Sequence, residues 1–182
     1  ELEGGEKIFG ESNISKSKNA ISRIGYLPEN PSALPSALES IKEADLIILG
    51  PGSLYTSLLP NLLVPEIVDA LLNSNAPKIY ISNLMTQPGE TDGLDVYQHI
   101  KSIEKQLSNF GVNTRIFNAV LSQIQFEKSP LIDYYRSRGA EPVQCNKEEL
   151  LSEGYYVLQA PLYAKRITPT LRHDSRRLAR AV

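Results

Sequence analysis

The segment ADLIILGPGSLYTS at residues 44–57 decides the fold class of this chain. Its apolar residues 46–49 have β character and stop at a turn of small residues, after which Ser53 begins a predicted helix or helical turn. Open α/β sheets bind ligands at the carboxyl ends of their strands, and the N–H groups of a helix N-terminus bind phosphate or carboxylate. Gly50, Pro51, Gly52 and Ser53 are therefore a candidate anion site. A tight strand-to-helix connection that binds nothing fits the same pattern, and no named nucleotide-binding motif is matched.

Strand and helix patterns alternate along the rest of the chain. We expect strands at residues 45–49, 78–82, 115–121, 142–145 and 155–158, and β character also at 7–9 and 21–27. Helices are predicted at residues 37–43, 66–73, 130–138, 147–152 and 175–181, the last of them basic. A further amphipathic helix has Val96, Ile100, Ile103 and Leu107 on one stripe. Such alternation predicts βαβ units around a mainly parallel sheet.

The composition is that of a globular chain with a buried core. Of its 182 residues 41% are hydrophobic and 22% are charged, and the net charge of −2 gives no field to gather nucleic acid or anionic membrane. No apolar run approaches the roughly 18 residues of a membrane span. The chain opens with Glu1, in polar sequence, so we expect a carboxyl-terminal piece of a longer protein.

Two residue types that often carry chemistry are rare here. Cys145 is the single cysteine, which excludes an internal disulfide and fits a reducing cytosol, and we interpret it as structural. His99 lies inside the predicted helix and is interpreted as a surface or half-buried residue. No metal motif, paired carboxylates or catalytic triad order is present.

A second polar loop, residues 83–93, follows the predicted strand at 78–82. It crowds side-chain donors and acceptors into a short stretch: Asn83, Thr86, Gln87, Glu90, Thr91 and Asp92. Thr91 or Asp92 is expected to cap the helix that follows. Two such loops after consecutive parallel strands would face one crevice, where a ligand's hydroxyl groups could be bound.

Two more candidates lie nearer the carboxyl end. Arg172 is suited to bidentate phosphate binding, whereas His173 beside Asp174 is better explained by an exposed histidine next to a helix cap. Tyr134 and Tyr135 are adjacent on a predicted helix, so one should pack and the other face outward, where it could stack on a base or sugar. Packing of both in the core is the alternative.

Five blocks, in this order, resemble the carboxyl-terminal part of the YvcK-type gluconeogenesis factors, bacterial cytosolic proteins of the CofD-like superfamily. They are GESNIS, ADLIILGPGSLYTSLLPNLLVPEI, NLMTQPGETDG, YRSRGAEPV and LRHDSRRLARAV. The resemblance covers nearly the whole chain. It implies a Rossmann-like three-layer α/β fold with a mainly parallel sheet, of which residues 1–182 are the carboxyl-terminal part of a single domain.

The resemblance further implies a nucleotide-sugar ligand, UDP-N-acetylglucosamine in particular. Tyr135 matches the tyrosine of the family's Y-x-x-x-G block and Arg172 the arginine of L-R-H-D, and both look like UDP-sugar contacts. The implied ligand-binding set is Gly50, Pro51, Gly52, Ser53, Tyr55, Thr56, Asn83, Thr86, Gln87, Glu90, Tyr135 and Arg172.

The chain departs from the family pattern at several places. The opening GGGTG turn and D-D-G-G-S-S segment are missing, so the fold is expected to be incomplete without that N-terminal half and the crevice half built. Glu66 stands where a glycine is usual, and Leu94 where an aromatic residue is frequent. We expect both smaller changes to be tolerated.

Three functions stay open on these grounds. The preferred one is a cytoplasmic regulatory protein without catalytic residues, cofactor or metal, which binds a nucleotide sugar and links carbon metabolism to cell-wall synthesis and cell shape. The second is a CofD-like transferase that moves a phospholactyl group from a nucleotide diphosphate donor to a deazaflavin with magnesium, although no tryptophan and only four phenylalanines offer an aromatic pocket. The third is an interaction module that docks through its basic tail. A homo-oligomer and a cell-wall-synthesis protein partner are also considered.

Overall fold

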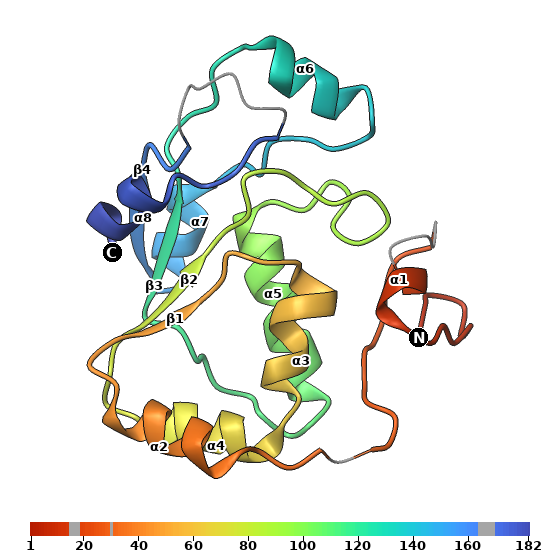
Figure 1. The fold of residues 1–182 in the computed structure, drawn as a ribbon, viewed down its shortest axis with the longest axis vertical. Coiled ribbons are helices and arrows are strands. Elements are labelled where there is room, and N and C mark those ends of the chain that lie inside the picture. Colours follow the sequence, from red (N-terminus) through yellow and green to blue (C-terminus); the bar gives the residue numbers. More distant parts are fainter. Residues whose placement is uncertain (15–18, 30, 164–169) are drawn as a thin grey trace.

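A parallel β-sheet forms the centre of the computed structural model, which describes residues 1–14, 19–29, 31–163 and 170–182 (Figure 1). Its strands are β1 (Ile47–Leu49), β2 (Lys78–Ile81), β3 (Ala119–Gln123) and β4 (Tyr156–Ala160), and they lie in the order β1-β2-β3-β4. All three neighbouring pairs are parallel. The predicted α/β class with a mainly parallel sheet is confirmed.

Helices fill the connections between the strands. The π-helical turn η1 (Leu54–Leu58) continues into α3 (Leu59–Leu62), and α4 (Pro65–Asn73) leads to β2. The long α5 (Val96–Ser108) connects β2 to β3, while α6 (Pro130–Arg136) and α7 (Lys147–Ser152) lie between β3 and β4. α1 (Glu11–Ile14) and α2 (Pro35–Glu43) precede the sheet and α8 (Ser175–Ala181) follows it. None of the helices in these described ranges has the length and apolar character needed to cross a bilayer.

Helix α5 begins with a capping box. The Asp95 carboxylate accepts the backbone N–H of Gln98, and the Gln98 side chain accepts the N–H of Asp95, which together form a capping box. The expectation that Thr91 or Asp92 caps this helix is therefore wrong. The predicted apolar stripe is confirmed, since Val96, Ile100 and their two partners are at most 1% exposed.

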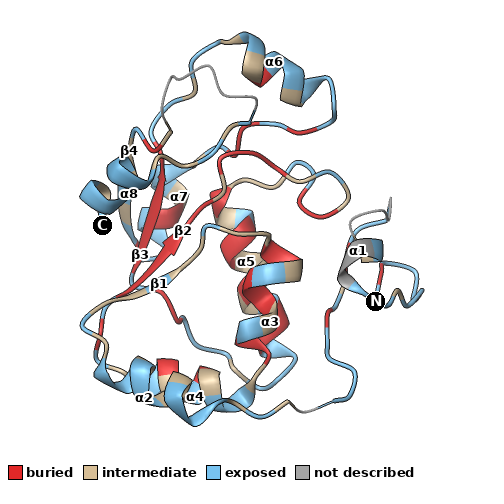
Figure 2. Cartoon of the chain, viewed as in Figure 1, coloured by how far each residue is buried: buried red, intermediate tan, exposed pale blue. Residues whose placement is uncertain are grey.

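The two faces of the sheet are covered unequally. Face 1, defined by Ile47, Leu49, Tyr80, Val120 and Val157, packs into one apolar cluster with the helices η1 to α5. Face 2 is defined by the residues that alternate with them. These are Ile48, Ile79, Ile81, Ala119, Leu121, Tyr156 and Leu158. Figure 2 shows β2 and β3 buried and α8 largely exposed.

The predicted strand at residues 142–145 and the β character expected at 7–9 and 21–27 do not give regular strands. Residues 7–9 and 21–27 belong to an N-terminal arm (residues 1–29), whose described residues form one β-bridge, from Leu2 to Ile21, and which docks on α5. In that docking the Gln106 amide accepts the Ile24 N–H and donates to the Ser22 carbonyl. Residues 142–145 likewise form only a bridge, from Pro142 to Met85. Residues 15–18, inside the predicted polar stretch between the arm's segments, lie outside the described residues.

β3 begins later than the predicted strand at 115–121. The Arg115 side chain turns away to stack over the Tyr155 ring, 4.9 Å from its centroid, and donates to the Glu153 carbonyl at 2.7 Å. The Asn118 side chain accepts the Lys78 N–H at 2.9 Å, just before regular pairing starts. Pairing of the main chain begins at Asn118, whose N–H donates to the Lys78 carbonyl and whose carbonyl accepts the Tyr156 N–H.

Candidate functional site

The loop after β1 needs glycine at two positions. Gly50 has φ +97°, and a Cβ there would lie 2.6 Å from the Ile81 carbonyl oxygen of the neighbouring strand. A Cβ on Gly52 would lie 3.0 Å from a methyl carbon of Leu58. The Gly50–Pro51 peptide bond is cis. Small residues thus let this loop lie directly against the end of β2.

Hydrogen bonds join this loop to the loop after β2. The Gly52 N–H donates to Asn83 Oδ1 at 3.2 Å, and the Ser53 hydroxyl donates to Glu90 Oε2 at 2.8 Å. Glu90 is only 8% exposed. The two predicted loops therefore meet at the carboxyl ends of β1 and β2.

The Glu90 carboxylate changes the electrostatics expected for this place. A phosphate close to Ser53 would meet the negative charge of Glu90, and both Ser53 Oγ and Gly52 N already have protein acceptors. Among the described residues there is no group of three or more His, Cys, Asp or Glu that could hold a metal ion to offset that charge. The loop is better suited to a ligand hydroxyl group than to a bare phosphate.

Further hydrogen bonds close the second loop on itself. Thr91 Oγ1 accepts the Gln87 N–H, and the Gln87 carbonyl accepts the Thr91 N–H, at 2.8 and 2.9 Å. The Asp92 carboxylate accepts the Gly89 N–H at 2.6 Å. Oε1 of Gln87 is buried without a hydrogen-bond partner in the described part of the chain. The loop is a defined turn whose amide side chain is still available.

Thr86 ties this loop to the segment that follows α6. Its backbone N–H donates to the Glu141 carbonyl at 2.7 Å, and its hydroxyl accepts the Glu141 N–H at 2.8 Å. The Val143 N–H donates to the Leu84 carbonyl at 3.0 Å. α6 and its tyrosines are thereby held beside the carboxyl end of β2.

The structure brings the segment containing Arg172 to Tyr135, although 37 positions separate the two residues. The Tyr135 hydroxyl accepts the Leu171 N–H at 3.1 Å. The Tyr135 ring packs on the apolar cluster of face 2, whereas Arg172 is exposed. Site residues from four separate stretches of sequence thus converge.

Tyr134 is the tyrosine that faces outward. It is 46% exposed, its ring stands edge-on to that of Tyr135 at 6.0 Å, and the Arg138 guanidinium lies 4.5 Å from its centroid. The expectation that one tyrosine packs and the other faces outward is confirmed. By exposure alone Tyr134 is the better platform for stacking, whereas the resemblance assigns the role to Tyr135.

The structure settles the alternatives for Asp174 and corrects those for His173. Asp174 caps α8 by accepting the N–H groups of Arg176 and Arg177. His173 is not exposed as expected. Burial lowers its pKa, opposed by a hydrogen bond with the Ser82 main chain, and its Nε2 has no partner among the described residues.

His99 lies in the interior, and Cys145 is half-buried. His99 is fully buried, so its interpretation as a surface or half-buried residue is wrong; its Nδ1 lies 2.6 Å from the Asp95 carbonyl, and burial lowers its pKa. Burial raises the pKa of the Cys145 thiol. A thiol with a raised pKa is a poor nucleophile at neutral pH, which agrees with a structural role.

Tyr55 and Thr56 point toward the N-terminal arm. Tyr55 is 7% exposed and belongs to the face 1 cluster. Together with Glu90 it lines a cavity of about 330 Å³ between the arm, the loop at 83–93 and α5. Thr56 lines a neighbouring hollow with Phe9 and Tyr26 of the arm. Among the described residues no hydrogen bond joins Tyr55 or Thr56 to Tyr135 or Arg172.

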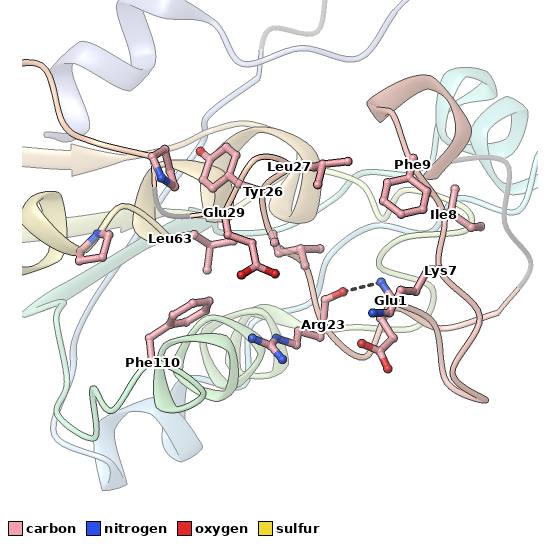
Figure 3. A pocket seen from close by; sticks show the side chains of 14 residues that line it. Glu1, Lys7, Ile8, Phe9, Arg23, Tyr26, Leu27, Glu29, Leu63 and Phe110 are labelled. Carbon is pink, nitrogen blue, oxygen red and sulfur yellow. Dashed lines mark hydrogen bonds between the residues drawn. The ribbon is translucent and has the colours of Figure 1, made fainter.

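A separate hollow of about 430 Å³ lies between the N-terminal arm, the residues that directly follow α3 and α5, and the start of α4 (Figure 3). The Arg23 guanidinium lies 5.7 Å from the centroid of the Phe110 ring, and the Arg23 carbonyl accepts the amino group of Glu1. Phe9 is 62% exposed at the opposite rim. None of the predicted site residues lines this hollow.

Sequence reasoning missed Glu141 and Ser82. Glu141 acts through its main chain on Thr86, 55 positions away, and Ser82 through its main chain on His173. Main-chain hydrogen bonds leave no trace in residue type. No sequence signal could have identified either residue.

Comparisons with known proteins agree with the resemblance. Residues 1–163 match the family model described as 2-phospho-L-lactate transferase CofD. The chain is 42% identical over 182 residues to a putative gluconeogenesis factor of Nostoc sp., covering all of this chain and 39% of that protein. It is 36% identical over 179 residues to the gluconeogenesis factor of Bacillus subtilis, covering 98% of this chain and 55% of that protein.

A solved structure gives the same result. The crystal structure of a member of the UPF0052 family from Bacillus halodurans superposes with a TM-score of 0.89 at 36% identity, covering 99% of this chain and 56% of that one. The chain thus spans about half the length of these relatives, or less.

Proposed function

The chain belongs to the CofD family, in the branch of the gluconeogenesis factors, and we propose that it binds a nucleotide sugar of the UDP-N-acetylglucosamine type. The observation that carries this proposal is the convergence of the loops after β1 and β2 with Tyr135 and the exposed Arg172. The carboxyl ends of parallel strands are the common ligand site of α/β folds.

Different parts of a nucleotide sugar suit different residues of the site. Arg172 presents a planar guanidinium that suits the diphosphate, because its paired N–H groups match two phosphate oxygens. The hydroxyls of the sugar or ribose suit the side with Ser53, Asn83 and Glu90, where carboxylate and amide oxygens accept hydrogen bonds. The rings of Tyr134 and Tyr135 offer an apolar face to the base or sugar.

The role we propose is regulatory. Relatives over the whole chain carry the name gluconeogenesis factor, which refers to carbon metabolism. A protein that binds a precursor of cell-wall polymers could report its supply to a partner of the cell-wall machinery, and thereby affect cell shape. We place this protein in the cytoplasm, where nucleotide sugars are made.

A transferase is the second candidate, favoured by the description of the matching family model. The test is incubation with a nucleotide diphosphate donor of a phospholactyl group, a deazaflavin and magnesium. A phosphodiester-linked product supports the transferase, and its absence under conditions that saturate the donor removes it.

Calorimetric titration with UDP-N-acetylglucosamine into the millimolar range tests the binding proposal. We expect Arg172→Ala to weaken binding at least tenfold and Arg180→Ala, an exposed arginine on α8, to leave it unchanged. Tyr135→Phe removes the bond to Leu171 and keeps the ring, whereas Tyr135→Ala removes both, so a larger loss in the alanine variant indicates a ring contact. Absence of binding, or equal affinities of wild type and Arg172→Ala, contradicts the proposal.

A further inference from the structure

Strand β4 lies at the edge of the sheet opposite β1 and lacks the features that usually protect such an edge. Within the described residues it pairs only with β3. Its sequence, YVLQA at residues 156–160, contains no charged residue and no proline. Edge strands are commonly shielded by lysine, proline or a bulge, because their unpaired N–H and C=O groups form a template for another strand. The outer edge of β4 is therefore open to pairing.

The register with β3 fixes which main-chain groups of β4 point outward. The Tyr156 N–H donates to the Asn118 carbonyl of β3's approach at 3.0 Å. In a parallel ladder every second residue bonds to the same neighbour, so Leu158 also faces β3, whereas Val157 and Gln159 turn their N–H and C=O groups to the outer edge. Neither of these two N–H groups has an acceptor in the described part of the chain.

Apolar side chains of β4 are exposed beside this edge. On face 2, Tyr156 is 76% and Leu158 is 41% exposed. The residue that continues this alternation is the small Ala160. α8 packs on face 2 through Leu178 and Ala181, which leaves Tyr156 and Leu158 uncovered. Two exposed apolar side chains next to an open edge are typical of an interaction surface.

A second copy of β4 fits this edge in one two-fold register. With Leu158 of both copies on the axis, the outward groups of Val157 meet those of Gln159 of the second copy, and the converse pair forms as well. Residues paired in this way in an antiparallel ladder exchange both of their hydrogen bonds, so each outward N–H finds an acceptor. On face 2 the large Tyr156 lies against the small Ala160 of the second copy, and the two Leu158 side chains meet.

Charges at the two ends of β4 are complementary in the same arrangement. The Glu153 carboxylate, which pairs with Lys101 at 3.1 Å, precedes the strand and is 41% exposed. The exposed Arg177 lies at the other end, where its guanidinium donates to the Tyr163 carbonyl at 3.1 Å. Antiparallel pairing brings the amino end of each strand to the carboxyl end of the other, so an acidic end meets a basic end twice. Such complementarity favours this partner and this register.

We propose that the protein forms a two-fold dimer in which β4 pairs antiparallel with β4 of a second copy, about an axis through Leu158. The interface is isologous, since the same strand contributes on both sides. The match of large to small side chains and of acidic to basic ends comes from the strand's own sequence, which is why a second copy fits better than an unrelated strand. The loops at 50–53 and 83–93 follow β1 and β2 and do not belong to this interface.

Charge variants on the axis test the dimer in the full-length protein. Analytical ultracentrifugation across the micromolar range should show a dimer for the wild type. Leu158→Lys and Leu158→Glu should each weaken dimerisation at least tenfold, because like charges then lie directly opposite each other. An equimolar mixture of the two variants should dimerise again, since residue 158 faces only its own symmetry mate. Leu72→Lys, at a 38% exposed leucine of α4, is the matched control and should dimerise like the wild type.

Cysteine cross-linking tests the register and does not depend on a charge in the interface. Residues directly opposite each other in an antiparallel pair are close enough for a disulfide, so Leu158→Cys should give a covalent dimer with a mild oxidant. Tyr156→Cys should not cross-link to itself, because it faces Ala160 of the second copy. A mixture of Tyr156→Cys and Ala160→Cys should cross-link.

Four outcomes would overturn the inference. They are a wild-type monomer, a dimer that Leu158→Lys does not weaken, the absence of a Leu158→Cys cross-link, and slow hydrogen exchange at the Val157 and Gln159 amides in a monomer. The last result would mean that another segment of the same protein covers the edge. None of these measurements uses a nucleotide sugar, so the proposed function and the dimer can fail independently.

Discussion

The two sides of the candidate site are built on different principles. On the side of β1 and β2, the polar groups bond to one another, as Gly52 does to Asn83 and Ser53 to Glu90. On the side of α6, Arg172 is exposed, and its guanidinium has no hydrogen bond or ion pair to another described residue. The first side holds the strand ends together, and the second presents groups to a ligand. Stability and recognition should therefore respond to different substitutions.

The largest effect on stability is expected at Gly50. Gly50→Ala places a methyl group 2.6 Å from the Ile81 carbonyl at φ +97°, which should cost about 3 kcal/mol of unfolding free energy. Gly93→Ala is the control, because φ there is +70° but nothing lies within 4 Å, and the cost should be about 1 kcal/mol. Urea unfolding measures both. Equal losses would show that the close approach to β2 is unimportant.

Removing the Glu90 carboxylate should have the next largest effect. Glu90→Ala leaves the Ser53 hydroxyl without its acceptor and should cost about 2 kcal/mol. Glu90→Gln keeps an acceptor oxygen in place and should cost less than about 1 kcal/mol. The measurement is again urea unfolding. If both variants unfold like the wild type, the hydrogen bond does not connect the loops in solution.

Acid should weaken the protein through its two histidines. Burial lowers the pKa of His99 and of His173 below the ordinary value of 6.5, so the unfolded state binds more protons than the folded one at mildly acidic pH. The stability that comes from keeping both histidines neutral in the folded state is complete above pH 6.5. It is lost as the pH falls toward the folded-state pKa values. Unfolding free energies from pH 8 to pH 5 should decrease.

Substituting each histidine in turn shows how much of this pH dependence each one causes. His99→Gln should reduce the slope more than His173→Gln, because His99 is fully buried. A wild-type stability that is equal at pH 5 and pH 8, or identical slopes in all three proteins, contradicts the assignment.

The smallest effect on stability is expected at Arg172, where the effect on binding is largest. Its exposed side chain makes no hydrogen bond or ion pair within the described ranges, so Arg172→Ala should change the unfolding free energy by less than about 0.5 kcal/mol. Comparing unfolding with the calorimetric titration separates the two properties. A loss of more than 1 kcal/mol would mean that Arg172 belongs to the framework.

The parts of the fold that sequence predicts well are those with strong periodicity. The stripe on residues 96–107 and the apolar run at β2 are buried as their patterns predict, and the apolar run at β1 forms a strand although Ile48 is exposed. The failures at 7–9, 21–27 and 142–145 are short segments of β character. Such segments become strands only when a neighbour offers a ladder, and here their neighbours are α5 and a loop.

The candidate site is predictable only in pieces. The loops at 50–53 and 83–93 follow strands, so parallel topology predicts that they meet, and the bonds from Gly52 and Ser53 confirm it. The meeting of Tyr135 with Leu171 depends on how α6 is oriented, which no periodicity encodes. The position of the Glu90 carboxylate beside Ser53 depends on the rotamer of Glu90, which no periodicity encodes either.

The paired hydrogen bonds between Thr86 and Glu141 limit which substitutions can be accepted at the two positions during evolution. Position 86 contributes a hydroxyl, so over evolutionary time we expect only threonine or serine to be accepted there. Position 141 contributes only its main-chain N–H and C=O, so any residue except proline preserves the link. Its carboxylate pairs at the surface with Arg136, a contact worth little. One joint between two segments thus constrains one partner strictly and leaves the other free to vary.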